Sequence, residues 1–161
     1  MIDDADLKRS SATDYDVTSM QSTSTEQLAE LIRKKHRVLV QLRDAGQRQS
    51  DLVASGDMPS LLKLLAAKQQ LISALHGLEC NLRPYYDEDP DSRHWNSPQD
   101  RAQCAQQAVE CNALLDDIVR LEKLGAETMI ERRNEVAEQL QQVHAAAHVR
   151  SAYQAQRQNR S

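Results

Sequence analysis

The residues of this chain best suited to chemistry are His144 and His148, which stand four positions apart near the C-terminus. In a helix this spacing places two imidazoles on one face, as zinc sites require. No third ligand is evident, although Glu138 or Gln141 could approach. Two solvent-facing histidines on an alanine-rich helix explain the pattern more simply, so we predict no metal site.

The cysteines Cys80, Cys104 and Cys111 are odd in number and lack the spacing of a metal knuckle. Cys104 and Cys111 lie seven residues apart on one helical face, where small buried thiols are expected. Nothing near them in the sequence would depress a thiol pKa. Because signal-peptide and membrane-spanning patterns are also missing from the sequence, we predict a cytoplasmic protein with reduced thiols.

Residues 83–96 are acidic but do not follow a calcium-binding loop, because the turn glycine and the glutamate at the twelfth position are missing. Two prolines break the helical pattern there and predict a loop. The aromatic residues of this loop, Tyr85, Tyr86 and Trp95, either fold back to plug the end of a bundle or form part of a docking surface. We favour the plug, because aromatic side chains usually bury against their own fold.

Several classes of function are excluded by what the sequence lacks. There is no glycine-rich phosphate loop and no nucleophile with a plausible base, so we predict no enzymatic activity, no catalytic residue and no cofactor. The net charge of −4 argues against binding to nucleic acid. One basic cluster spans residues 33–37, and we interpret it as a solvated helix face whose long stems lie along a helical seam.

The elements that must position any binding residue form a helical hairpin. Apolar residues recur at three- and four-residue steps over 28–82, on both sides of the turn signal Ser55-Gly56-Asp57. Gly56 can adopt the left-handed conformation that ends a helix, Asp57 can cap the next helix, and Pro59 suits its first turn. The capping box Ser24-x-x-Gln27 predicts the start of the first helix, so we expect helices over 24–55 and 58–82.

The second arm of this hairpin resembles the FlgN-type flagellar export chaperones through the run Gly56-Asp57-x-x-x-Leu61-x-x-Leu64-x-x-x-Lys68-Gln69-x-Leu71-x-x-x-Leu75-x-x-Leu78-Glu79. A helix of similar length precedes the run, as in that family. The resemblance implies a cytosolic chaperone that holds the C-terminal amphipathic helical segments of hook-associated flagellar proteins. It also implies that such clients are kept unassembled and delivered to the export apparatus.

The third helix should begin at Pro98, because Ser97 can cap it, and its apolar pattern predicts a helix over 98–157. Residues 1–23 are rich in Ser, Thr and Asp and lack a sustained period, which predicts a disordered N-terminal segment. The expected fold is therefore all-α, with an antiparallel hairpin and a long third helix in one coiled-coil-like three-helix domain over 24–161.

The predicted lengths do not match. Hairpin arms of about 48 and about 37 Å cannot cover an unbroken helix of about 90 Å, in which Gly125 is the one weak point. The third helix folds back, pairs with a second copy, or holds a client. Under the client interpretation we predict partner contacts at five residues, which are Met129, Ile130, Val136, Leu140 and Val143. The alternative is a self-associating structural coiled coil with no client.

Overall fold

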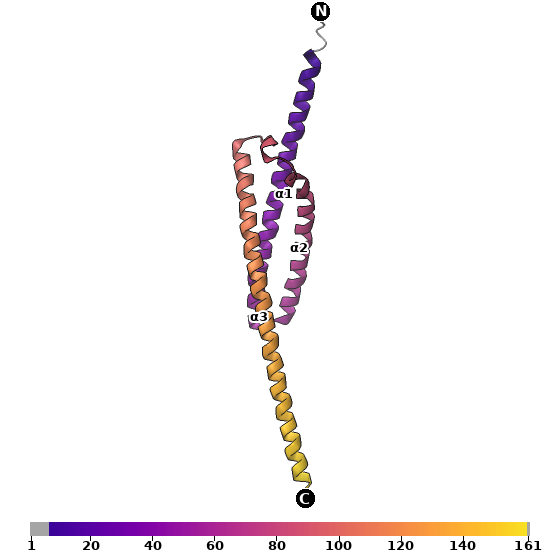
Figure 1. Cartoon of the computed structure of the whole chain (residues 1–161), viewed down its shortest axis with the longest axis vertical. Coiled ribbons are helices and arrows are strands. Elements are labelled where there is room, and N and C mark those ends of the chain that lie inside the picture. The colour runs from indigo at the N-terminus through magenta and orange to yellow at the C-terminus, as the bar shows by residue number, and fades with distance from the viewer. Residues whose placement is uncertain (1–6, 161) are drawn as a thin grey trace, which may run out of the picture. The chain divides into compact units, whose positions relative to one another are not determined.

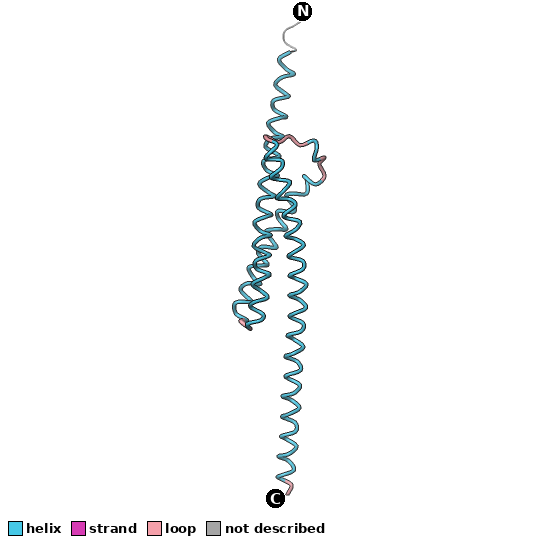
Figure 2. Tube along the Cα trace, turned by 90° about the vertical axis from the view of Figure 1, so that its left-hand side faces the viewer, coloured by secondary structure: helices cyan, strands magenta, loops and turns pink. Residues whose placement is uncertain are grey.

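The computed structural model describes residues 7–160 and contains three long helices: α1 (Leu7–Ser55), α2 (Met58–Tyr86) and α3 (Pro98–Gln158). A short 3-10 helix, η1 (Pro90–Ser92), precedes α3, and no strand occurs within residues 7–160. Figures 1 and 2 show these helices and the two loops that join them. The predicted all-α three-helix fold is confirmed. The chain divides into two compact units, unit 1 (Met1–Leu121) and unit 2 (Glu122–Ser161).

The turn between α1 and α2 forms as the sequence predicts. Gly56 adopts a φ of 74°, and its N–H donates to the Leu52 carbonyl at 3.0 Å. The left-handed conformation at this position causes no steric strain, because glycine has no Cβ. Asp57 then caps α2 by accepting a hydrogen bond from the Ser60 N–H at 3.2 Å. The Ser60 side chain and this N–H together lower the pKa of the Asp57 carboxyl.

The core of unit 1 consists of two small aliphatic clusters along the seam between its helices. One cluster joins Leu28 and Ile32 of α1, Leu82 of α2 and Cys104 of α3. The other cluster contains Leu39, Leu42, Cys111 and Leu114. Both clusters combine residues of the hairpin with the first half of α3. The two buried thiols therefore serve as small apolar groups, as their spacing predicts.

Polar residues at seam positions of α1 are paired across the bundle. The buried Lys35 contacts Glu79 of α2, with its Nζ 2.5 Å from Oε1, and also donates to the Tyr86 hydroxyl at 3.5 Å. Lys68 donates to Gln49 at 2.7 Å. A buried ammonium without a partner would be costly, so these pairs explain how the seam accepts non-apolar residues.

The third helix also completes the seam at a glycine of α1. A Cβ built on Gly46 would lie 3.4 Å from the Leu121 side chain of α3. A small residue at this position lets the leucine pack close to the α1 backbone. Gly46 stands at a position of α1 that a strict heptad would fill with an apolar residue. At such positions the sequence predicts that the first arm of the hairpin depends on a third helix.

The start of α1 differs from the sequence prediction. The helix begins at Leu7 instead of Ser24, so residues 7–23, which the sequence assigns to a disordered segment, are helical. The first six residues of that segment lie outside the described part of the chain. Extending an existing helix adds one hydrogen bond for each residue fixed, and no glycine or proline stops it between Leu7 and Ser24. The capping-box pattern therefore lies in the helix interior.

The end of α2 also differs, since the predicted loop over 83–96 begins four residues later. The last helical turn contains Pro84 and continues to Tyr86. Proline in a helix removes one backbone hydrogen bond. Tertiary contacts offset this loss, because Tyr85 packs against the first core cluster and the Tyr86 hydroxyl donates to Glu79 at 3.2 Å.

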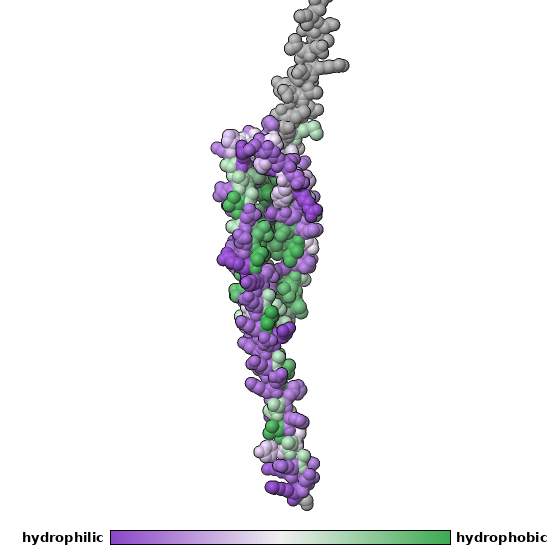
Figure 3. Space-filling model, in the orientation of Figure 1, coloured by the Kyte–Doolittle hydropathy of each residue, from purple (hydrophilic) through white to green (hydrophobic). Residues whose placement is uncertain are grey.

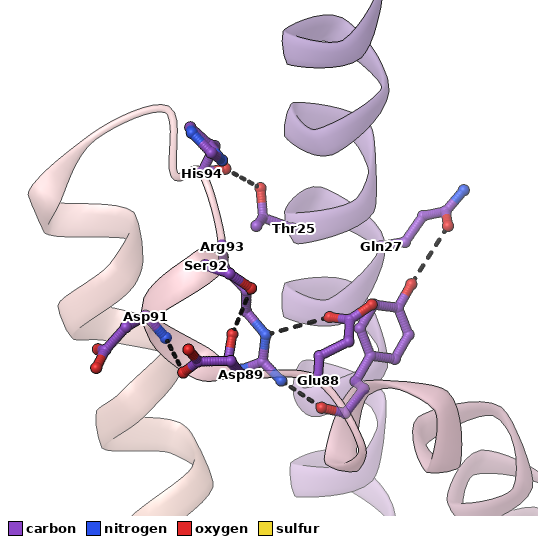
Figure 4. A network of polar contacts seen from close by, with 9 residues as sticks. Thr25, Gln27, Glu88, Asp89, Asp91, Ser92, Arg93 and His94 are labelled. Atoms are coloured by element: carbon purple, nitrogen blue, oxygen red, sulfur yellow. Dashed lines mark hydrogen bonds and ion pairs between the residues drawn. The ribbon is translucent and has the colours of Figure 1, made fainter.

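A network of hydrogen bonds fixes the loop between α2 and α3 (Figure 4). Asp89 caps η1 by accepting from the Asp91 N–H at 3.0 Å. The Arg93 guanidinium donates to the Tyr85 carbonyl, and the Thr25 hydroxyl of α1 donates to the His94 carbonyl at 2.9 Å. Trp95 packs against the first core cluster together with Tyr85. These two aromatic residues therefore plug the end of the bundle, as predicted, whereas Tyr86, which was predicted to join them, is 56% exposed.

Replacing Glu79 with alanine should destabilise unit 1, because the buried Lys35 would lose its carboxylate partner. We expect Glu79→Ala to lower the free energy of unfolding by about 1–2 kcal/mol in urea denaturation. The matched control is Asp91→Asn, which removes the exposed Arg101–Asp91 pair and should cost less than about 0.5 kcal/mol. Equal effects of the two substitutions would contradict a structural role for the buried pair.

Alkaline pH should destabilise the fold through Lys35 and its neighbour Tyr86. Burial alone would lower the pKa of Lys35, but the hydrogen bond and charge of Glu79, together with Tyr86, outweigh it and hold this pKa above its ordinary value. Burial also raises the pKa of Tyr86. Over the pH range in which the unfolded chain releases these protons, both groups keep them in the folded state. Their stabilisation is thus complete below about pH 10 and is lost as pH rises through the folded pKa values.

The measurement is the urea midpoint across this pH range for the native chain and for a Lys35→Met, Tyr86→Phe variant. The urea midpoint of the native chain should fall more steeply with rising pH than the midpoint of the variant. Burial raises the pKa of Cys104 and Cys111 as well, so these thiols add an earlier decline to both proteins. The Lys35 charge lowers the pKa of Cys111, so its loss enlarges the Cys111 part of this decline in the variant, and the two curves are compared above about pH 10. Parallel curves would show that Lys35 and Tyr86 do not couple to folding.

Candidate partner-binding surface

The five predicted partner-binding residues lie in unit 2, and every one of their side chains is exposed. The exposed fractions are 42% for Met129, 51% for Ile130, 48% for Val136, 55% for Leu140 and 64% for Val143. The helix α3 continues through Gly125 without interruption. Each residue from 126 to 160 is exposed in the single chain. These apolar side chains are therefore accessible.

Four of these residues share one narrow face of the helix. Met129, Val136 and Val143 follow each other at steps of seven, and Leu140 lies four residues beyond Val136. At 100° per residue these four positions fall within an arc of about 60°. We call this set the unit 2 stripe. Ile130 lies about 100° from Met129, outside the stripe.

The opposite face of unit 2 is acidic over its first half. Four glutamates, Glu127, Glu131, Glu135 and Glu138, fall within an arc of about 80° on the side away from the stripe. Figure 3 shows the resulting alternation on one side of the molecule, where green apolar patches along this helix are separated by purple polar ones. Unit 2 is thus an amphipathic helix, although Glu122 falls within the arc of the stripe and Arg132 and Arg133 lie about 20° from its two edges.

Sequence reasoning missed three further exposed apolar residues of unit 2. Leu124, Val149 and Tyr153 are 55%, 56% and 69% exposed. They fall on the side of the helix opposite the stripe, so a search for one periodic face leaves them out. The signal that marks two of them is the four-residue step between Val149 and Tyr153, which places them on the same face.

The histidine pair lies beside the unit 2 stripe. Both His144 and His148 are exposed, and they line a shallow depression with Ala145, Ala147 and Ser151. Within the described residues, no three His, Cys, Asp or Glu side chains come together in a way that could hold a metal ion. The arrangement therefore offers two separate imidazoles on a helix surface.

The basic cluster over 33–37 is divided among different environments. Lys35 is buried against Glu79, His36 lies 2.9 Å from Glu110 of α3, and Arg33 pairs with Glu30 at 2.5 Å. The cluster therefore includes a buried cation as well as surface pairs, which differs from a wholly solvated face. Its members point to several neighbours, so they do not form one continuous basic patch.

Two further results bear on the class of protein. No helix within residues 7–160 is long and apolar enough to cross a membrane. No protein-family model, curated protein or solved structure matches the chain. The function is consequently inferred from the exposed apolar residues of unit 2 and from the sequence of residues 56–79 in α2 and the turn before it.

Proposed function

We propose that this chain is a cytoplasmic flagellar export chaperone, which binds the C-terminal amphipathic helical segment of hook-associated proteins and keeps them unassembled for secretion. The observation that carries the proposal is the exposed unit 2 stripe. The resemblance of residues 56–79 to FlgN-type chaperones supports the choice of client and the delivery to the export apparatus. The proposal assigns no catalytic step to any residue.

The binding mode follows from the amphipathic character of unit 2. A client segment with its own apolar stripe would lie along Met129, Val136, Leu140 and Val143 and remove both stripes from water. Burying an aliphatic side chain contributes about 1.5–3 kcal/mol, from which the ordering of the client must be subtracted. Four such side chains suffice for reversible capture, which suits a chaperone that must later release its client.

Charging the stripe should abolish client binding without unfolding the chain. We expect Leu140→Asp with Val143→Asp to weaken binding of a purified hook-associated protein about a hundredfold, because two carboxylates would be buried in the complex. Both side chains are more than half exposed, so the helix content by circular dichroism should change little. Isothermal titration calorimetry measures the affinity.

The matched control is Gln141→Asp with Gln142→Asp, which adds the same charge in the same turn of α3 but off the stripe. This variant should bind the client like the native chain. If both double variants lose binding equally, the stripe is not the contact. If Leu140→Asp with Val143→Asp loses helix content together with binding, these residues stabilise the fold, and the proposal fails.

The solution mass distinguishes a chaperone from a structural coiled coil that pairs with itself. We expect light scattering after gel filtration to show a stoichiometric complex when the chain is co-expressed with a hook-associated protein. A client competes for the same stripe that a second copy would use. A stable homodimer whose mass is unchanged by such clients would favour the self-associating protein instead.

A further inference from the structure

A groove that the proposed function does not use runs between α1 and α2, and we call it the hairpin groove. It consists of two depressions of about 500 and about 360 Å³, which adjoin because Lys34 and Asn81 line both of them. All of its lining residues come from the hairpin, and none comes from α3 or from unit 2. It is therefore separate from the unit 2 stripe.

The floor of the hairpin groove is apolar and open at one glycine. Leu31, Val38 and Leu78 line it with partly buried side chains. Gly77 lies in the interior of α2, where glycine costs about 1 kcal/mol relative to alanine. A Cβ built on Gly77 would meet no atom within 4 Å, so packing within the chain does not require glycine there. Its lack of a side chain leaves room for a group from outside.

The rim of the hairpin groove is basic, although the whole chain carries a net charge of −4. Lys34 lines both depressions and makes no ion pair within the described chain. Arg37 is 65% exposed, with its Nη2 3.7 Å from Glu30. The Glu30 carboxylate, which also lines the groove, is shared with Arg33 at 2.5 Å, so one acid pairs with two arginines and Lys34 adds a further positive charge. The rim thus retains positive charge.

We propose that the hairpin groove is a second docking site, which takes an acidic amphipathic helix of a partner protein. The apolar face of that helix lies over Leu31, Val38 and Leu78, close to the α2 backbone at Gly77. Its carboxylates pair with Lys34 and Arg37. Such an arrangement follows helix-in-groove recognition, in which apolar anchors supply affinity and flanking charges set orientation.

A second copy of the chain fits this groove less well. Two copies that paired groove to groove about a twofold axis would bring the same basic rims together, which like-charge repulsion disfavours. A groove that took a different surface of another copy would form a heterologous contact, which builds filaments unless its rotation closes a ring. An acidic partner helix avoids both problems.

The test uses the full chain and two synthetic helical peptides that share one leucine stripe. In one peptide glutamates flank the stripe, and in the other lysines replace them. Fluorescence anisotropy should show that the glutamate peptide binds about tenfold more tightly than the lysine peptide. Added salt should reduce this preference, because the rim charges are exposed.

Filling the groove should remove the site without harming the fold. Gly77→Leu places a side chain in the open space and improves helix propensity, so thermal stability should stay the same or rise. We expect it to weaken the glutamate peptide about tenfold, whereas Gly77→Ala should bind almost like the native chain. Lys34→Glu should also weaken binding several-fold, and the exposed unit 2 residue Lys123→Glu is its matched control.

Four results would overturn the proposal. The first is equal binding of the two peptides, and the second is native affinity in Gly77→Leu. The third is a native mass of two copies that Gly77→Leu converts to one, which would make a second copy the occupant. Loss of peptide binding in the Leu140→Asp, Val143→Asp variant alone would place the peptide on the unit 2 stripe, which also contradicts the groove while leaving the proposed chaperone function intact.

Discussion

Unit 1 depends on burying slender aliphatic side chains along one seam between its helices. The chain has no phenylalanine, so its interior is built from leucine, isoleucine and small thiols. Leu39, Leu82 and Cys111 are the largest side chains that are almost fully buried. A thin seam stabilises each helix only over the length that a partner covers. The reach of the hairpin therefore limits how much of α3 can gain stability from packing.

The lengths of the elements make that limit concrete. The 29 residues of α2 span about 44 Å, and the 61 residues of α3 span about 92 Å. Unit 1 ends at Leu121, and the apolar residues beyond it are exposed. Contiguous exposed apolar surfaces often mark sites of interaction in proteins. The proposed function follows from this imbalance.

Local signals in the sequence predict the end of a helix correctly where only a few residue types can adopt the conformation or form the cap that is needed there. Gly56 and Asp57 predict their turn because a left-handed conformation and a side-chain cap have narrow requirements. Ser97 likewise accepts a hydrogen bond from the Asp100 N–H at 3.1 Å. The predicted start of α1 and the predicted end of α2 are wrong for different reasons. No glycine or proline interrupts α1 between Leu7 and Ser24, and tertiary contacts of Tyr85 and Tyr86 stabilise the last turn of α2 beyond Pro84.

The candidate surfaces were predictable to different extents. Periodicity alone places Met129, Val136, Leu140 and Val143 on one face, and the structure adds only that they are exposed. The hairpin groove could not be predicted, because a sequence shows which face of each helix is apolar but not the space between two helices. The pairing of Lys35 with Glu79 was missed for the same reason, since it joins residues of different helices. The identity of a client cannot be predicted from geometry at all.

The helices of unit 1 pack against one another, whereas unit 2 is an unpacked helix that we propose binds a partner. Hydrogen exchange of the full chain, followed by mass spectrometry, tests this difference most directly. Amides around Leu39, Leu82 and Cys111 should exchange slowly, and amides beyond Leu121 should exchange rapidly until a client is added, because an unpacked helix opens easily. Slow exchange along 126–158 in a monomeric chain without a client would contradict the account.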